Sequence, residues 1–324
     1  YSLPFFFLIF FSSCSKDSKE TIISGNTMGT TYSITILDFI HNKVEFKAKI
    51  DKQLDTINQK FSTYIADSEI SNINKSNAEL IKLSDEFKYV LDKALYYCKL
   101  VNGNYDITIA PLVDLWGFTS SDNVIPSDDD IKAIMGNIGY EKISLNNQFL
   151  VKKNKNIDLD LNSIAKGHGV DKISKFLDDS GYGNYLVEIG GELRSKKISD
   201  HDDWIIGIQN PESNSIIKKI KLNNLSMATS GTYNNFFKLD GVLYSHILNP
   251  KTGYPYKHKT ISATVIAEEC IDADAYATLA MTMEPLDVVD LLNRTSDVEV
   301  YIIEIDDNNK IIEYMSSGFK GMVY

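Results

Sequence analysis

The order of helix-like and strand-like segments constrains this chain more than any other feature. Before Gly181 several segments carry apolar residues every three to four positions, whereas beyond Gly181 short strand-like runs predominate and two helices interrupt them. A doubly wound parallel sheet needs a regular alternation of strands and helices, which is absent. The sequence therefore predicts an α+β fold.

Helical periodicity is clearest near the N-terminus, where apolar residues recur at steps of three and four from Phe46 to Phe61. Ser84, followed by two acidic residues, is typical of a helix N-cap, and Ser127 with Asp130 has the spacing of a capping box. The predicted helices cover residues 44–62, 85–101, 127–136, 164–177, 272–283 and 285–293.

Strands are predicted where short apolar or β-branched runs lie between turn residues. Residues 26–37 read as a loop that runs into a strand. The other predicted strands cover residues 142–145, 149–151, 157–161, 185–189, 193–196, 204–208, 216–222, 236–239, 260–266 and 298–305.

Length and charge exclude several classes of protein. The chain has 324 residues, of which 43% are hydrophobic, and this is enough apolar material to exclude a disordered chain or a small disulfide-stapled scaffold. Its 33 Lys and Arg against 44 Asp and Glu give a net charge of −11, which argues against nucleic-acid binding. Any polyanion that it binds must therefore be met by local donors or by a divalent cation.

The first residues resemble an export signal. The apolar run 3–11 is too short to span a bilayer, which takes about 20 residues, and it ends in Ser12, Ser13 and Cys14 before the chain turns polar. A cysteine after two small residues resembles a bacterial lipobox; the alternative is that Cys14 is incidental. We expect an N-terminally truncated export signal at 1–14, acylation of Cys14, a polar tether at 15–24 and the folded domain at 25–324. This places the protein at the cell inner membrane, lipid-anchored on the periplasmic or extracytoplasmic side.

The other cysteines, Cys98 and Cys270, form no C-x-x-C pair with each other or with Cys14, so zinc and thioredoxin-like sites are not indicated. Neither G-x-G-x-x-G after a strand nor G-x-x-x-x-G-K-[ST] occurs. Nucleotide binding through those two devices is therefore not indicated either.

Polar residues gather where a strand gives way to a helix at 158–169. Main-chain N–H groups at such a junction can meet an anion, and Lys166 adds a positive charge. A helix N-cap with a solvated lysine is an equally good interpretation. Nearby, Gly190 and Gly191 interrupt a strand, which commonly marks a bulge or the close approach of another backbone or a ligand.

Two later clusters also suggest a site. Hydroxyl residues at 227–233 and the segment 244–255, with His246 and a P-K-T-G turn, suggest the rim of a pocket, although a lone histidine is more often structural. Asp274 and Thr278 lie four residues apart, so on a helix they share one face, and two oxygen ligands on one face suit a hard cation such as Mg²⁺. A capping Asp with a buried Thr is the alternative.

Seven motifs follow one another along the chain: T-M-G-T-T-Y, Y-D-I-T-I-A-P-L-V-D-L-W-G-F, D-L-N-S-I-A-K-G, E-I-G-G-E-L-R, S-G-T-Y, S-H-I-L-N-P-K-T-G-Y-P and A-D-A-Y-A-T-L-A-M. In this order they resemble the ApbE family, the FAD:protein FMN transferases, from about Gly25 to the C-terminus. The resemblance implies a T-fold-related α+β fold with mixed or antiparallel sheets and packed helices in one compact catalytic unit. It also implies export, since many members of the family are lipoproteins.

The activity that the resemblance implies is a Mg²⁺-dependent cleavage of FAD. FMN passes through its phosphate to a Thr or Ser hydroxyl of an acceptor flavoprotein, and AMP leaves. The divalent ion would neutralise the pyrophosphate that an acidic protein repels. An FAD pyrophosphatase that releases FMN and AMP, or a flavin-binding lipoprotein without turnover, is the alternative.

The resemblance also implies roles for particular residues. His246 would be the general base that takes the proton of the acceptor hydroxyl, and Asp274, Thr278 and the main-chain carbonyl of Ala165, near Ala277, would hold the metal. Side chains around FAD would be Met28, Tyr64, Asn104, Tyr105, Asp106, Asn162, His168 and Ile247. Three positions depart from the usual pattern: His168 stands where Tyr is frequent, Asn162 and Ser163 where a Gly is frequent, and Glu192 where Asp or Asn is common.

Overall fold

The computed structural model describes residues 20–324 except 39, 120–123, 199–200, 212, 214, 233–235, 240–241, 257–258 and 307, and at 236–239 and 242–243 it describes the backbone alone. The predicted export signal, with Cys14, and residues 15–19 of the predicted tether lie outside the described residues. Residues 21–24, also predicted as tether, instead belong to strand β1, because Ile23 is buried in the core opposite Ile34.

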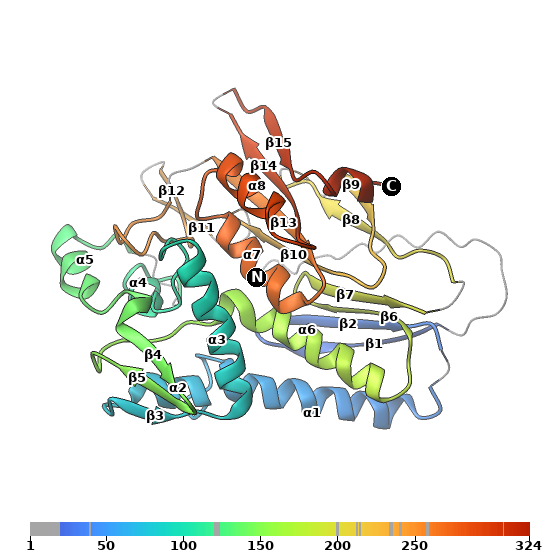
Figure 1. Cartoon of the computed structure of the whole chain (residues 1–324), viewed down its shortest axis with the longest axis horizontal. Helices are drawn as coiled ribbons and strands as arrows, with labels where there is room; N and C mark the ends of the chain where they lie inside the picture. The colour runs from blue at the N-terminus through green and yellow to red at the C-terminus, as the bar shows by residue number, and fades with distance from the viewer. Residues whose placement is uncertain are drawn as a thin grey trace.

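Among the described residues, eight strands form one antiparallel sheet, which confirms the predicted α+β class (Figure 1). Their order across the sheet is β1-β2-β6-β7-β10-β13-β14-β15. The strands are β1 (Thr21–Thr27), β2 (Thr30–Ile36), β6 (Asn184–Ile189), β7 (Glu192–Lys197), β10 (Ser226–Gly231), β13 (Thr260–Ala267), β14 (Glu299–Ile305) and β15 (Ile311–Met315).

Helices cover one face of this sheet. Helix α1 lies against β1, α6 against β6 and β7, α7 against β10 and β13, and α8 against β14 and β15. Helix α3 packs on the outer side of α6 and α7. These helices are α1 (Lys43–Phe61), α3 (Asp85–Leu100), α6 (Asn162–Asp179), α7 (Cys270–Ala280) and α8 (Pro285–Asn293).

The opposite face is covered by the hairpin of β8 (Ile205–Gln209) and β9 (Ile216–Lys221) and by α9 (Phe319–Met322). Strand β6 is buried along its whole length because both faces are covered. Tyr185, Val187 and Ile189 join the main core on the helical side, whereas Leu186 joins the second core under β8 and β9. The main core extends from β1 to β14, so the described chain is built around one shared interior.

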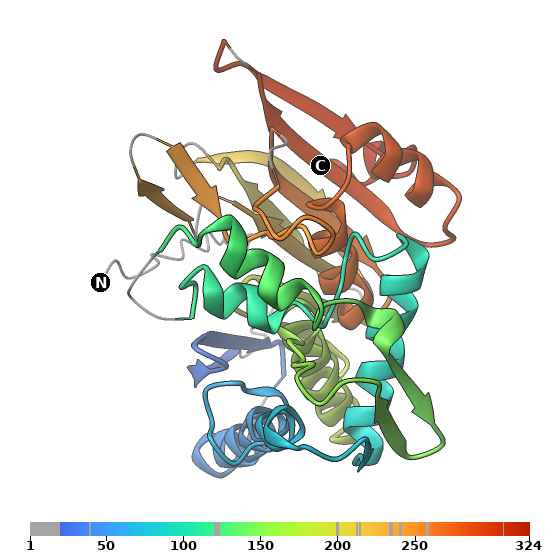
Figure 2. The same cartoon turned by 90° about the vertical axis from the view of Figure 1, so that its left-hand side faces the viewer.

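Smaller elements complete the molecule. Helices α4 and α5 face the viewer in Figure 2, between α1 below and the β11–β12 hairpin above. A sheet of β3, β5 and β4 lies beside α2 and α3. The bounds are α2 (Glu69–Lys75), β3 (Leu80–Lys82), α4 (Ala110–Leu115), α5 (Asp128–Met135), a 3₁₀ turn (Tyr140–Lys142), β4 (Ile143–Asn146), β5 (Phe149–Lys152), β11 (Phe236–Leu239) and β12 (Val242–Ser245).

Capping and periodicity account for the helices that the sequence predicts. In α1 the buried residues are Ile50, Leu54, Ile57 and Phe61, which lie on one face. Ser84 accepts a hydrogen bond at the start of α3, and α5 opens with the predicted capping box. No helix among the described residues has both the length and the apolar character to cross a bilayer.

One strand that the sequence predicts is wrong. Residues 157–161 bury every second side chain but form no strand, because the Asn74 side chain takes the place of a partner strand. Its Nδ2 donates to Leu159 O (2.9 Å), and its Oδ1 accepts from Leu159 N (2.8 Å). Gly190 and Gly191 mark no bulge, because they are the two-residue turn between β6 and β7, with φ of 62° and 107°. A close approach is present at Gly190: its N–H donates to the main-chain oxygen of Thr31 (3.0 Å), and a Cβ atom there would lie 2.7 Å from Cγ2 of Thr30.

Candidate active site

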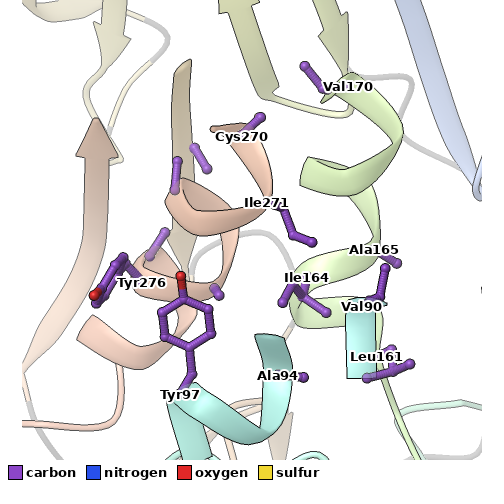
Figure 3. Close-up of a cluster of buried hydrophobic side chains, with 14 of the residues drawn as sticks. Val90, Ala94, Tyr97, Leu161, Ile164, Ala165, Val170, Cys270, Ile271 and Tyr276 are labelled. Carbon is purple, nitrogen blue, oxygen red and sulfur yellow. The ribbon is translucent and has the colours of Figure 1, made fainter. Parts of the chain in front are cut away.

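Helices α6 and α7 touch at Gly167, in the centre of the molecule. A Cβ atom there would lie 2.3 Å from the carbonyl oxygen of Cys270 and 2.8 Å from Cβ of Asp274. Figure 3 shows the two helices side by side, with Ile164 and Ile271 pointing toward each other between them. Only a residue without a side chain permits this approach, so Gly167 sets the spacing of the two helices.

This contact joins the two helices that carry the predicted metal ligands. The Asp274 side chain is buried, and its Oδ2 accepts a hydrogen bond from the main-chain N–H of Gly167 (2.8 Å). Thr278 lies one helical turn further along α7, and its Oγ1 is 3.2 Å from Oγ of Ser230 on β10. Ala165 precedes Gly167 by two residues on α6, and Ala277 is fully buried beside Thr278.

Asp171 fixes the start of α7. Its carboxylate accepts hydrogen bonds from the N–H groups of Cys270 (3.0 Å) and Ile271 (2.8 Å), and Arg194 on β7 donates a third (2.7 Å). A carboxylate at a helix N-terminus satisfies N–H groups that have no partner within the helix. Asp171 thus ties α7, with Asp274, to α6 and to the sheet.

A lysine stands among the carboxylates of this region. Lys166 Nζ donates to Oε1 of Glu192, at the start of β7, whereas Oε2 of Glu192 is buried without a hydrogen-bond partner. Burial raises the pKa of Glu192 and of Asp274, and Lys166 opposes both shifts. Burial also raises the pKa of Glu188 to about 7, again against attraction to Lys166. One ammonium therefore faces three carboxyl groups.

The donor set suits a hard cation. A carboxylate and a hydroxyl, with a main-chain carbonyl, are the oxygen ligands that Mg²⁺ prefers. In the part of the chain that the structure describes, no group of three or more His, Cys, Asp or Glu side chains could hold a metal ion. The predicted set agrees with this finding, because it contains one acidic side chain beside a hydroxyl and a main-chain oxygen. The excess of carboxyl groups over Lys166 favours a cation electrostatically.

Residues 104–106, predicted to contact FAD, lie beside the start of α6. The hydroxyl groups of Tyr105 and Ser163 are 2.7 Å apart, and Asn162 is the exposed first residue of the helix. Asp106 is buried and accepts hydrogen bonds from Thr108 and from the N–H of Tyr140. Burial raises the pKa of Asp106, and these hydrogen bonds oppose the rise.

His246 and Ile247 begin a loop that folds back on the same region. Tyr256 near its end donates to the main-chain oxygen of Asn104 (3.1 Å), and Lys251 donates to the Asn104 side chain (2.7 Å). Trp116 holds the loop from beneath by donating to Gly253 O (2.8 Å). The structure thus brings together residues 104–106, the start of α6 and the loop that carries His246, which is half-buried with its ring 6.4 Å from that of Phe118.

The other three residues predicted for FAD have different surroundings. Met28 occupies the β1–β2 turn with φ of 50°, and its sulfur would lie 3.3 Å from a Cβ at Gly169. Tyr64 is 75% exposed in the turn after α1. His168 is buried, and its Nε2 lies 3.0 Å from Oε1 of Glu86. Lys172 and His168 together hold the pKa of Glu86 down at about 2, with the hydrogen bond from His168 as the larger cause.

Several contacts of this region did not emerge from the sequence. Ser163 and Ser230 belong to the quoted motifs, but their partners, Tyr105 and Thr278, come from distant segments. Asp171 gave no signal except that it is an acidic residue in the middle of an amphipathic helix. Two cavities of about 490 and 450 Å³ lie elsewhere, beside α2 and between α3 and α7, and none of the predicted site residues lines them.

We expect Gly167→Ala to lower the free energy of unfolding by about 1–3 kcal/mol, the usual range for overpacking a core. The added methyl group meets the Cys270 carbonyl, so α7 has to move and carry Asp274 with it. Urea denaturation measures the change. Gly136→Ala is the matched control, because that glycine has open space around it and an ordinary helical φ. Equal stabilities of Gly167→Ala and the wild type would contradict the close contact.

Comparison with known proteins identifies relatives over nearly the whole chain. The sequence model of a family described as the ApbE family matches residues 28–302. The chain is 36% identical to the FAD:protein FMN transferase of Vibrio cholerae over 321 residues, which are 97% of this chain and 96% of the relative. It is 34% identical to the Haemophilus influenzae protein of the same name, over 95% of this chain and 93% of the relative. The solved structure of the flavin transferase ApbE from Vibrio cholerae superposes with a TM-score of 0.86 at 34% identity, covering 94% of this chain and 99% of that one.

Proposed function

Because the chain belongs to the ApbE family, we propose that it is an FAD:protein FMN transferase that passes FMN, through its phosphate, to a Thr or Ser hydroxyl of an acceptor flavoprotein and releases AMP. The relatives confirm the predicted family and the predicted enzyme class, a transferase. The observation that carries the proposal is the contact of Asp274 with Gly167, since it joins the helix of Asp274 and Thr278 to the helix of Ala165.

We propose that these residues hold Mg²⁺. Asp274 would supply a carboxylate oxygen, Thr278 its hydroxyl and Ala165 its main-chain carbonyl. When bound, the ion would offset the negative charge of the FAD pyrophosphate. The excess of carboxyl groups, those of Asp274, Glu188 and Glu192, around the one ammonium of Lys166 supports a cation at this place.

The transfer itself is a displacement at phosphorus. The acceptor hydroxyl oxygen forms a bond to the FMN phosphorus, the bond from that phosphorus to the bridging oxygen breaks, and AMP leaves with the bridging oxygen. His246 would take the hydroxyl proton on an imidazole nitrogen. The protein contributes mainly by positioning the groups and stabilising charge, as in other phosphoryl transfers.

The remaining predicted residues would bind the dinucleotide. Tyr105, Asp106 and Asn104 stand next to the start of α6, and Ile247 stands beside His246. Aromatic and thioether side chains pack well on flat rings, which suits Tyr64 and Met28. Among the residues predicted to bind FAD, Asn162 and His168 stand where this chain departs from the usual family pattern.

The proposal is tested by incubating the protein from Ser15 onward with FAD, Mg²⁺ and an acceptor domain that carries a Ser/Thr flavinylation motif. Flavin fluorescence that stays with the denatured acceptor supports transfer. AMP and free FMN without labelling would instead indicate a pyrophosphatase. Unchanged FAD would leave only a flavin-binding protein and would contradict both enzymatic functions.

We also propose that a lipid on Cys14 holds the protein at the extracytoplasmic face of the inner membrane, where membrane flavoproteins are natural acceptors. The support is the lipobox-like sequence around Cys14. In cells that express the complete gene, Cys14→Ser is expected to move the protein from the membrane fraction to the soluble fraction. Cys98→Ser is the control, because Cys98 is a buried free thiol. A Cys14→Ser protein that stays in the membrane fraction would contradict the anchor.

A further inference from the structure

The pairing of Lys166 with Glu192 is not explained by the metal ligands or by the general base. Glu192 begins β7, directly after the tight Gly190–Gly191 turn, so its backbone is held on two sides by the β6–β7 hairpin and by β10 beyond. Its side chain is 3% exposed, whereas that of Lys166 is 31% exposed. Lys166 is thus a partly exposed lysine whose ammonium is bonded to a buried carboxylate.

An ion pair of this kind contributes little to the stability of the fold. The Oε2 atom of Glu192 has no hydrogen-bond partner, and an unsatisfied buried acceptor costs free energy. A buried ion pair can often be replaced by apolar residues without loss of stability. An unsatisfied buried acceptor of this kind is expected at functional sites. The question is therefore which ligand groups Lys166 can bind.

Lys166 lies at the predicted phosphate site. It follows Ala165 and precedes Gly167, whose N–H binds Asp274. Its ammonium bonds to Oε1 of Glu192, and the residue lies between the two α6 positions that the proposed metal site uses. An ammonium has three donors, of which Glu192 Oε1 takes one, so donors remain for a second anionic partner.

We propose that Lys166 donates a hydrogen bond to a phosphate oxygen of the FAD pyrophosphate during binding and transfer, and that Glu192 is the positioning residue that holds its ammonium there. This inference rests on the proposed function for its substrate. Lys166 keeps its proton throughout. The bond that breaks is still the one between the FMN phosphorus and the bridging oxygen, which leaves with AMP.

The length of the Glu192 side chain determines where its carboxylate holds the Lys166 ammonium. Where the resemblance leads us to expect Asp or Asn, this chain has a side chain longer by one methylene group. Because Glu192 starts at a fixed position after the turn, the extra length sets how far its carboxylate extends toward α6. Glu192→Asp is therefore expected to draw the ammonium away from the phosphate and to lower kcat while the fold stays intact.

The test uses the double variant Lys166→Met/Glu192→Leu, which replaces the ion pair with an apolar pair. Its thermal unfolding is expected to match that of the wild type. Its affinity for FAD in EDTA, measured by flavin fluorescence, should fall about tenfold because one charge-assisted hydrogen bond is lost. Its kcat for FMN transfer at saturating Mg²⁺ should fall by about 10²–10³-fold, as when one charge-stabilising donor is removed.

Single variants distinguish a direct contact of Lys166 with the phosphate from the positioning role of Glu192. Lys166→Arg keeps the cation and should recover most of the FAD affinity, whereas Glu192→Gln should lower kcat more than it changes KM for FAD. In a Lys166→Met background Glu192→Gln should have no further effect on kcat, because Glu192 acts through Lys166. Glu192→Gln also serves as the readout if the double variant does not fold.

Two results would overturn the inference. A folded double variant that binds FAD as tightly as the wild type would rule out the contact, whether or not the wild type labels an acceptor. A kcat of Glu192→Gln equal to that of the wild type would rule out the positioning role. Failure of the wild type itself to transfer FMN, with FAD affinity still dependent on Lys166, would instead count against the proposed function alone.

Discussion

Replacing Asp274 with alanine is expected to abolish Mg²⁺-dependent turnover of FAD. The change removes the one carboxylate of the proposed metal ligand set, so the remaining hydroxyl and main-chain oxygens bind Mg²⁺ too weakly to support catalysis. The assay measures AMP release over a range of Mg²⁺ concentrations. We expect no recovery of activity at high Mg²⁺.

Two further variants make this result specific. Asp274→Ala also removes the hydrogen bond that its carboxylate accepts from the N–H of Gly167, so Asp274→Asn, which keeps an acceptor oxygen, is assayed beside it. Asp272→Ala is the matched control, because Asp272 lies on the same helix but bonds to Lys93 and Tyr97 on α3. Normal turnover by a folded Asp274→Asn variant would show that the carboxylate charge is not needed, and normal turnover by Asp274→Ala would exclude Asp274 as the metal ligand.

Replacing His246 with alanine is expected to slow FMN transfer by about 10²–10⁴-fold, the usual contribution of a general base. FAD binding should change little, because His246 is proposed to act on the acceptor hydroxyl. The loop that carries His246 is held at other points, by Trp116 and by Tyr256, so the variant should keep its structure. Rates of acceptor labelling and FAD affinity are measured on the same preparation.

A second histidine serves as the control for this variant. His201 precedes β8 on the far side of the sheet from α6 and α7, so His201→Ala is expected to transfer FMN at the wild-type rate. If His246→Ala also transfers at that rate, the assignment of His246 as the base is wrong. If it loses FAD binding as well, the histidine contributes to the dinucleotide site instead.

Sequence patterns predict those parts of the fold that local forces determine. The periodicity of α1, the N-cap at Ser84 and the capping box at Ser127 involve residues a few positions apart, and the structure confirms them. The failed strand at 157–161 has the opposite origin. The main chain of Leu159 bonds to the side chain of Asn74, more than 80 residues earlier, and no local pattern predicts such a contact.

The candidate site also combines residues that local patterns predict with contacts that only the folded structure reveals. Asp274 and Thr278 could be placed on one face of a helix from their spacing, whereas the glycine that lets α6 approach them could be understood only once Cys270 and Asp274 were seen against it. The pairing of Lys166 with Glu192 likewise depends on how α6 lies across β7. Tertiary packing, which no short-range pattern encodes, decides these contacts.

The central claim is that this chain joins FMN covalently to an acceptor, and the intact mass of the acceptor tests it most directly. After incubation with the wild-type protein, FAD and Mg²⁺, the acceptor is expected to gain the mass of FMN less one water, with one AMP released for each acceptor modified. With EDTA, or with Asp274→Ala, its mass should not change. An unmodified acceptor in a reaction that nevertheless consumes FAD would contradict the account.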